Sequence, residues 1–88
     1  MITQEEIKEL KLASEEAGRI YEIAKQAYED ALQAHSKAKT EESLRAVKKA
    51  GNTLKVAEKV YNKLLDDFIR AMAEFIVEKE KAQARKKG

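Results

Sequence analysis

The stretch HSKAKTEES, residues 35–43, interrupts two long helical patterns and so decides how the chain folds. Upstream of it, small and apolar residues recur every three or four positions, which is the period of one helix face. Downstream of it, the same spacing resumes and continues to Phe75. The chain contains no proline, and its bias towards alanine, glutamate, lysine and leucine is typical of long amphipathic helices. A turn between Lys39 and Thr40 therefore predicts an all-α fold, an antiparallel hairpin of two helices.

Each predicted helix has a start signal in the sequence. Thr3 is placed to cap the first helix, and Glu6, three residues later, completes a capping box. Thr40 is placed to cap the second helix, with acidic residues directly after it in the positive end of the helix dipole. We expect the two helices to cover about residues 4–38 and 41–86.

Gly51 and Asn52 leave open a break in the second helix, because glycine often ends a helix and asparagine often starts one. The apolar spacing passes through Gly51 without a change of phase, which favours one continuous helix. The two internal glycines also have two interpretations. Each is either a tolerated defect that costs about 1 kcal/mol, or a seat for a tyrosine ring on the other helix.

The alignment of the two helices follows from the turn. If the turn is centred between Lys39 and Thr40, residues at the same height have numbers that add up to about 79. This register places Gly18 level with Tyr61 and Gly51 level with Tyr28. It also makes one flank of the hairpin complementary, with apolar facing apolar and acid facing base; the pairs of this predicted ladder are Glu9–Arg70, Glu16–Lys63, Ile23–Val56, Asp30–Lys49 and Lys37–Glu42.

The ladder selects which apolar residues face each other inside the hairpin. Mainly small residues next to it are expected to line the inside of the hairpin; they are Leu10, Ala13, Ala17, Ile20, Ala24, Ala27, Ala31, Ala34 and Ala38 on the first helix, facing Ala50, Ala57, Leu64 and Ala71 on the second. The larger apolar residues then point away from the hairpin. Such a stripe exceeds the few hundred Å² that a monomer normally exposes, so a partner should cover it.

The predicted partner interface consists of Ile7, Tyr21, Tyr28, Leu32, Leu44, Val47, Leu54, Tyr61, Leu65, Phe68, Met72 and Phe75. The simplest partner is a second copy of the chain, which would give a homodimeric four-helix bundle of the coiled-coil type. A helix of another protein is the alternative occupant.

The sequence lacks the residues that most enzymes and metal sites need. Cysteine is absent, and His35, the only histidine, has leucine and alanine at the preceding helical positions where a metal motif would place glutamate. It is expected to be a packing or turn-edge residue. Adjacent acidic pairs diverge by about 100° on a helix and so do not form an acid–base couple. We expect no enzyme, and hence no catalytic residues, metal, cofactor or small-molecule substrate.

Basic side chains form the one other pattern that suggests a function. A stripe on the second helix and the basic end of the chain are candidate contacts for a phosphate backbone; these residues are Arg45, Lys48, Lys55, Lys59, Arg85, Lys86 and Lys87. Lys49 and Lys63 lie on the same arc but are assigned to the ladder. Residues 1–78 are predicted to form the hairpin, and residues 79–88 a basic C-terminal helical extension or tail.

These patterns predict a non-enzymatic helical interaction module, such as an adaptor, an assembly factor or a small regulator. In architecture, the expected dimer is similar to the Rop-type plasmid RNA-binding proteins, which are dimeric helical hairpins, although the two share no motif. That resemblance implies a nucleic-acid-binding regulator as the alternative function, and a helical inhibitor of another protein is a further one. No membrane-spanning run or signal peptide is evident, which suggests a cytoplasmic protein, and the small, simple chain would suit a phage or mobile element.

Overall fold

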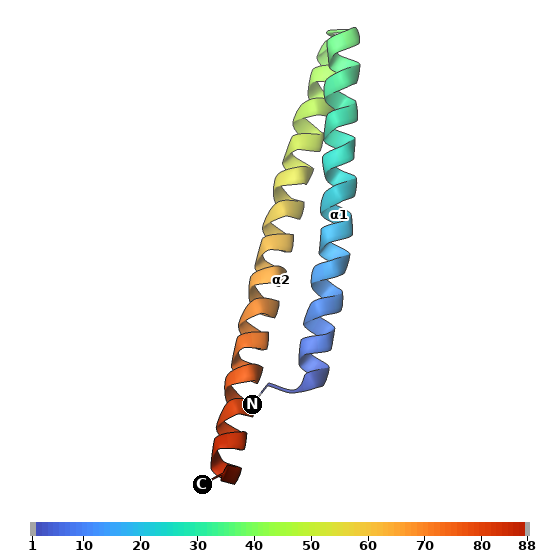
Figure 1. Cartoon of the computed structure of the whole chain (residues 1–88). Coiled ribbons are helices and arrows are strands. Elements are labelled where there is room, and N and C mark those ends of the chain that lie inside the picture. Colours follow the sequence, from blue (N-terminus) through green and yellow to red (C-terminus); the bar gives the residue numbers. More distant parts are fainter. Residues whose placement is uncertain (1, 88) are drawn as a thin grey trace.

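The computed structural model describes residues 2–87, and the side chains of Lys86 and Lys87 lie outside the described part. Two antiparallel helices, α1 (Gln4–Lys37) and α2 (Glu41–Lys87), are joined by a short turn (Figure 1). Together they make a rod with Cα extents of 72 × 15 × 14 Å. The predicted all-α hairpin is confirmed, and each helix ends within one residue of its predicted end.

Both predicted caps are confirmed by hydrogen bonds. The hydroxyl of Thr3 accepts a hydrogen bond from the backbone N–H of Glu6 at 3.1 Å. At the start of α2, the Thr40 hydroxyl accepts from the Ser43 N–H at 3.0 Å, while the Ser43 hydroxyl accepts from the Thr40 N–H at 3.1 Å. This reciprocal pair satisfies two of the free N–H groups at the helix end, which fixes where α2 begins.

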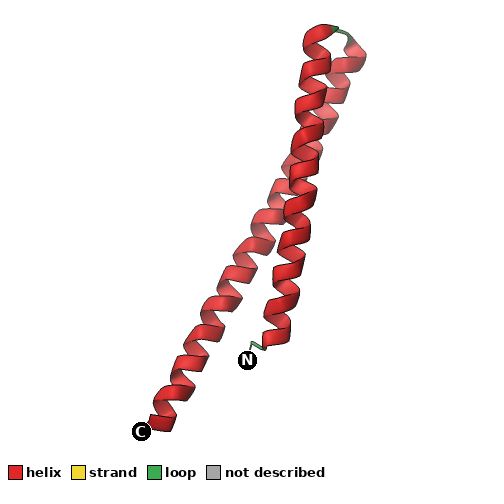
Figure 2. Ribbon diagram, turned by 45° about the vertical axis from the view of Figure 1, so that its right-hand side comes forward, coloured by secondary structure: helices red, strands yellow, loops and turns green. Residues whose placement is uncertain are grey.

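Helix α2 runs without a break through Gly51 and Asn52. Figure 2 shows loop only before α1 and at the turn, so the alternative with a third helix is wrong for the described chain. Continuity is consistent with the uninterrupted apolar spacing across Gly51. The α2 helix also continues past the level at which α1 begins, up to Lys87 (Figure 1). The predicted division at residue 78 stays a prediction.

The two helices pack through a heptad row that we call the inner seam. Every residue of this row is buried or half-buried, and neighbours in it are three or four positions apart. The inner seam consists of Ile7, Leu10, Ser14, Ala17, Tyr21, Ala24, Tyr28, Ala31 and His35 on α1, and of Ser43, Val47, Ala50, Leu54, Ala57, Tyr61, Leu64, Phe68, Ala71 and Phe75 on α2.

The predicted inside is confirmed for four alanines, because Ala17, Ala24, Ala57 and Ala71 are buried. The prediction that the aromatic residues all lie outside is wrong. The rings of Tyr21 and Tyr61 stack between the helices, with centroids 5.8 Å apart and an interplanar angle of 13°. Ile20, which was expected inside, is 51% exposed. The physical reason is that the rings of Tyr61 and Tyr28 fit against Gly18 and Gly51 of the opposite helix. The seam therefore buries aromatic area that two facing alanine rows could not supply.

The predicted register and the interpretation of the glycines as ring seats are confirmed. A Cβ atom placed on Gly18 would lie 3.1 Å from Cε1 of Tyr61, and one on Gly51 would lie 3.3 Å from Cε1 of Tyr28. Residue numbers add up to 79 in both contacts. The absence of a side chain at these two positions therefore lets a tyrosine ring approach the opposite backbone.

The spacing of the helices follows the sizes of the seam residues. In both views the helices are closest near the turn and spread towards the N-terminus of α1 (Figure 1 and Figure 2). Ala24, Ala31 and Ala50 belong to the half of the seam nearer the turn, whereas Leu10, Phe68 and Phe75 lie in the wider half. Small side chains allow a close approach of helix axes, and large ones hold them apart.

Candidate partner-binding surface

One side of the hairpin carries a row of small and apolar residues that we call the outer strip, and all of them except the half-buried Ala13 are exposed. On the helical wheel most of it lies next to the inner seam, about 70° from the seam's centre, while Ile23 and Val56 lie farther round, at about 130°. Its members are Ala13, Ile20, Ile23, Ala27 and Ala34 on α1, and Ala46, Thr53, Val56 and Val60 on α2. The four largest side chains are 49% to 70% exposed; they are Ile20, Ile23, Val56 and Val60.

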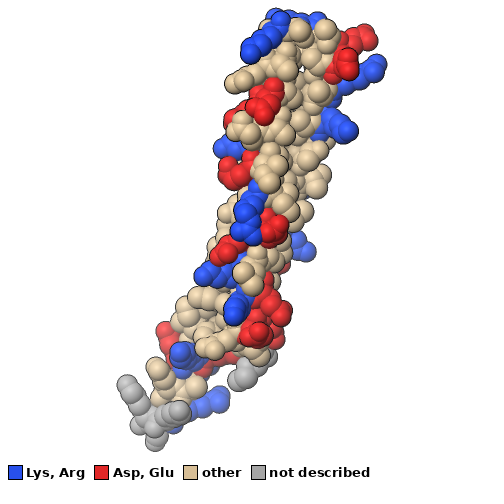
Figure 3. Space-filling view, turned by 90° about the vertical axis from the view of Figure 1, so that its right-hand side faces the viewer, with Lys and Arg blue, Asp and Glu red and all other residues tan. Residues whose placement is uncertain are grey.

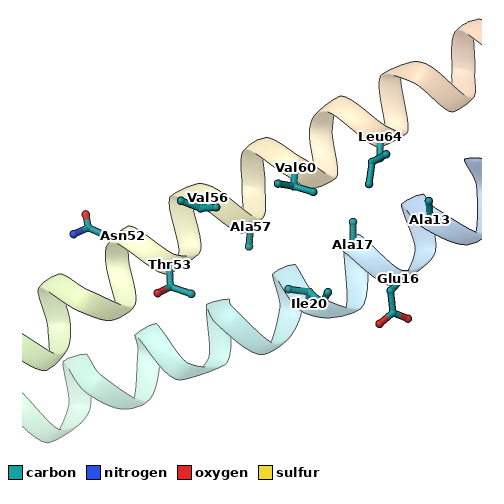
Figure 4. A pocket seen from close by; sticks show the side chains of 10 residues that line it. All are labelled: Ala13, Glu16, Ala17, Ile20, Asn52, Thr53, Val56, Ala57, Val60 and Leu64. Atoms are coloured by element: carbon teal, nitrogen blue, oxygen red, sulfur yellow. The ribbon is translucent and has the colours of Figure 1, made fainter.

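The outer strip forms an open groove between the two helices. Its walls come from both helices, and its floor includes Ala17 and Ala57, the buried alanines of the seam. Figure 4 shows these two alanines pointing towards the opposite helix, whereas Asn52 and Glu16 point away. The groove has a volume of about 690 Å³, and nearly all of its lining atoms are apolar. An apolar side chain of a partner helix would therefore meet a matching surface here.

The charged side chains that flank the groove differ between the helices. The row on α1 contains Glu9, Glu16 and Asp30, and the row on α2 contains Lys49, Lys63 and Arg70. Both rows are exposed, and no ion pair joins one to the other among the described residues. Residues of these rows point about 130° away from the centre of the seam, so their charged ends diverge and do not meet inside one hairpin.

The predicted ladder of ion pairs is thus wrong as an internal feature of the chain. Glu16 instead pairs with Arg19 along α1, and Arg70 pairs with Asp66 at 2.7 Å along α2. The hydrogen bond and charge of Glu16, together with the charge of Glu15, raise the pKa of Arg19 above its ordinary value, against a small opposing effect of burial. Both pairs are exposed, and such pairs contribute little to stability.

The opposite side of the hairpin is more polar. A second hollow there is lined by parts of Tyr61, Leu65 and Phe68, but also by the charged residues Lys11 and Glu15. Figure 3 shows one side of the rod on which acidic and basic side chains are interspersed with other residues. A continuous apolar partner would bury more charge on the opposite side than in the outer strip.

The residues predicted for the partner interface lie mainly in the inner seam. Nine of the twelve are half-buried, which leaves Leu32, Leu44 and Met72 exposed, at 42%, 41% and 36%. Contact of these residues with a partner stays a prediction. Our sequence reasoning did not identify the outer strip as exposed, although Ile20 with Ile23 and Val56 with Val60 are visible in the sequence as bulky residues three or four positions apart.

The candidate nucleic-acid contacts on α2 are exposed. Arg45, Lys48, Lys55 and Lys59 have no ion pair among the described side chains, and the same holds for Lys49 and Lys63. Asp30, which was expected to hold Lys49, accepts a hydrogen bond from Gln26 at 3.0 Å instead. Arg85 is exposed, whereas Lys86 and Lys87 fall outside the described side chains. The structure therefore leaves more cations unpaired on this stripe than the sequence predicted.

His35 lies at the turn, as predicted. Its Nδ1 atom is 2.7 Å from the Ser43 hydroxyl, which is also within hydrogen-bonding distance of the carbonyl oxygens of Ala38 and Thr40, at 3.0 and 2.9 Å. The serine has one hydroxyl hydrogen, so when a carbonyl takes it, the Nδ1–H group of His35 donates to the serine oxygen. This network ties the end of α1 to the start of α2, which is a structural role.

Among the described residues, no group of three or more histidine, cysteine, aspartate or glutamate side chains could hold a metal ion. No helix in the same part of the chain is long and apolar enough to cross a membrane. Comparison of the chain with protein-family models, with curated proteins and with solved structures gives no match. The surfaces of the hairpin are therefore the features that bear on its function.

Proposed function

We propose that the chain is a non-enzymatic interaction module that pairs through its outer strip with a copy of itself or with a helix of a partner. One observation carries this proposal: Ile20, Val56 and Val60, which are 49% to 62% exposed, line one apolar groove shared by both helices. Ile23, which is 70% exposed, lies three residues along α1 from Ile20, on the border of this groove. Exposed apolar surface that is gathered in one groove, and not scattered singly, is typical of interaction sites. Adaptor, assembly factor and small regulator are all roles of this kind.

Site-specific photo-crosslinking in the producing cells tests this proposal. A photoreactive amino acid at Ile23, which is 70% exposed, should give covalent adducts with the bound partner. The matched control carries the same group at Glu22, the exposed neighbour that points about 100° away. Adducts at position 23 well above those at position 22 support the proposal, and equal or absent adducts reject it. The mass of the adduct shows whether the partner is a second copy or another protein.

Nucleic-acid binding is the second candidate function, and the six unpaired cations on α2 favour it. Lysine and arginine side chains along a helix can follow a phosphate backbone, and their binding weakens steeply with salt. No aromatic residue stands among these six, which favours contact with phosphates over stacking on bases. The candidate therefore predicts weak and largely sequence-independent binding.

A charge-reversal experiment tests this second candidate. The triple variant Lys48→Glu, Lys55→Glu, Lys59→Glu should lose binding to RNA and duplex DNA in a low-salt titration. A control variant with the same change of charge on α1 should keep part of this binding; it carries Lys8→Glu, Lys11→Glu and Lys25→Glu. Unchanged binding in the α2 variant would reject the stripe, and an equal loss in both variants would show that only net charge matters.

A further inference from the structure

The two charged rows beside the outer strip have opposite signs. Residues of the acidic row on α1, Glu9, Glu16 and Asp30, are spaced by multiples of seven, and so are Lys49, Lys63 and Arg70 of the basic row on α2. In each row the position left between the charges is apolar; it is Ile23 on α1 and Val56 on α2. Both rows border one face of one hairpin, and no ion pair connects them within it.

A second hairpin can cover this face with a two-fold axis in one of two directions. With the axis along the rod, the turns of both copies lie at the same end, and α1 of each copy packs on α2 of the other. With the axis across the rod in the plane of the interface, α1 packs on α1 and α2 on α2. The first arrangement places the acidic row against the partner's basic row, whereas the second places like charges together.

We infer that the outer strip binds a second copy of this chain with the two-fold axis along the rod. A lengthwise axis keeps every residue at its own height, so the register of the single hairpin also holds between the copies. Ile23 then lies opposite the partner's Val56, and Glu16 opposite the partner's Lys63. The complementary pairs that do not form within one hairpin are thus completed between two, twice per dimer.

The size of the face fits this partner. From Ala13 to Ala34 the strip is about 32 Å long at 1.5 Å per residue, and it is two helices wide. This offers several hundred Å² on each copy, which is on the order of the ~800 Å² per partner of a standard stable interface. The small residues of the strip allow the helices of the two copies to approach closely, and the result is a four-helix bundle in which every neighbouring pair is antiparallel.

The inference rests on the proposed function, and a charge swap on the purified full chain tests it. Glu16→Lys and Lys63→Glu should each weaken dimerisation about tenfold in sedimentation equilibrium, because each places two like-charge contacts in the dimer. The double variant should restore the affinity. Glu15→Lys is the control with the same charge change on the polar side, and it should leave the affinity nearly unchanged. A stronger dimer in the Glu16→Lys variant would indicate the crosswise axis and overturn the inference.

Disulfide trapping gives a second measurement that does not depend on charge. The chain has no cysteine, so an Ile23→Cys chain and a Val56→Cys chain can be mixed and oxidised. The lengthwise axis predicts that mixed dimers form quickly and that each chain alone forms few. Rapid homodimer formation by the Ile23→Cys chain alone, with little mixed product, would overturn the inference.

These results separate the inference from the proposed function. If the purified chain stays monomeric at high micromolar concentration while Ile23 crosslinks another protein in cells, the inference falls and the interaction module stands. If neither self-association nor crosslinking at Ile23 occurs, both fall. A dimer that responds to the charge swap supports both.

Discussion

The inner seam and the outer strip run side by side along the same two helices, yet only the seam closes the hairpin. The seam combines large and small residues, so that Tyr61 lies over Gly18 and Tyr28 over Gly51. The strip offers only alanine, threonine, valine and isoleucine. Aromatic side chains can bury about 150–250 Å² each, far more than alanine. The helices therefore face each other through the seam, in which aromatic rings pack against small residues.

The comparison shows that complementarity of size, and not similarity of size, selects the internal interface. Two facing alanine rows would bring the helices close but would bury little apolar area. A ring against a glycine gives both a close approach and a large buried area. The strip that remains outside is small and smooth, which suits a second interface formed after the hairpin is closed.

The sharpest test of this difference is the same substitution in both rows. Ala24 lies in the seam and is 6% exposed, whereas Ala27, three residues on, lies exposed in the strip. Ala24→Glu should lower the free energy of unfolding by about 3 kcal/mol or more, because it buries an unpaired carboxylate. Ala27→Glu should change it by less than about 0.5 kcal/mol. Urea unfolding followed by circular dichroism at low micromolar concentration measures both, and equal losses would contradict the assignment of the rows.

The aromatic pair predicts the next largest effect. Tyr61→Ala removes the stack on Tyr21 and uncovers Gly18. Because the ring is only half-buried, we expect a loss of about 2–3 kcal/mol, at or below the lower end for a core aromatic residue. Val60→Ala, one residue away in the strip, should change the free energy of unfolding by within about 0.5 kcal/mol, since better helix propensity offsets lost contacts. Thermal and urea unfolding of the two variants compare them, and a loss from Val60→Ala as large as that from Tyr61→Ala would overturn the distinction.

Much of the hairpin could be predicted from the sequence because its signals are local. The caps at Thr3 and Thr40, the turn and the single long α2 depend on a few neighbouring residues each. The register also follows once the turn is fixed, since every later pair is set by the rise per residue. The contacts of Gly18 and Gly51 with tyrosine rings are consequences of that register.

The rotation of each helix about its own axis could not be predicted in the same way. The seam and the strip have the same seven-residue period, and on α1 Tyr21 and Ile20 are adjacent in sequence, so periodicity alone does not choose between them. The complementary charges beside the strip favoured placing Ala13, Ile20, Ala27 and Ala34 inside the hairpin. Charges on the flank of a helix are, however, as well placed for another chain as for their own, and the isolated hairpin leaves Glu16 and Lys63 apart.

The hydrogen bonds of Ser43 at the turn are expected to have a smaller effect on the free energy of unfolding. Ser43 binds Thr40, Ala38 and His35 through its hydroxyl, so Ser43→Ala should cost about 1–2 kcal/mol of unfolding free energy. Ser36 is the control, because its hydroxyl donates only to the carbonyl of Gln33 on the exposed surface. Ser36→Ala should stay within about 0.5 kcal/mol of the unmodified chain. If both serine variants unfold alike, the turn network does not hold the helices together.

The smallest expected effect concerns the contact between Gly18 and the ring of Tyr61. In an exposed helix, replacing glycine by alanine stabilises by about 1 kcal/mol, but a Cβ atom on Gly18 would lie 3.1 Å from Tyr61. The ring cannot easily yield because it is stacked on Tyr21. Gly18→Ala should therefore give no net gain, or a slight loss, in urea unfolding. The same substitution in the Tyr61→Ala background should recover the gain of about 1 kcal/mol, and this difference between the two backgrounds measures the contact. A full gain in the original background would mean that the ring does not need a glycine beneath it, and the size complementarity that distinguishes the seam from the strip would then rest on Gly51 and Tyr28 alone.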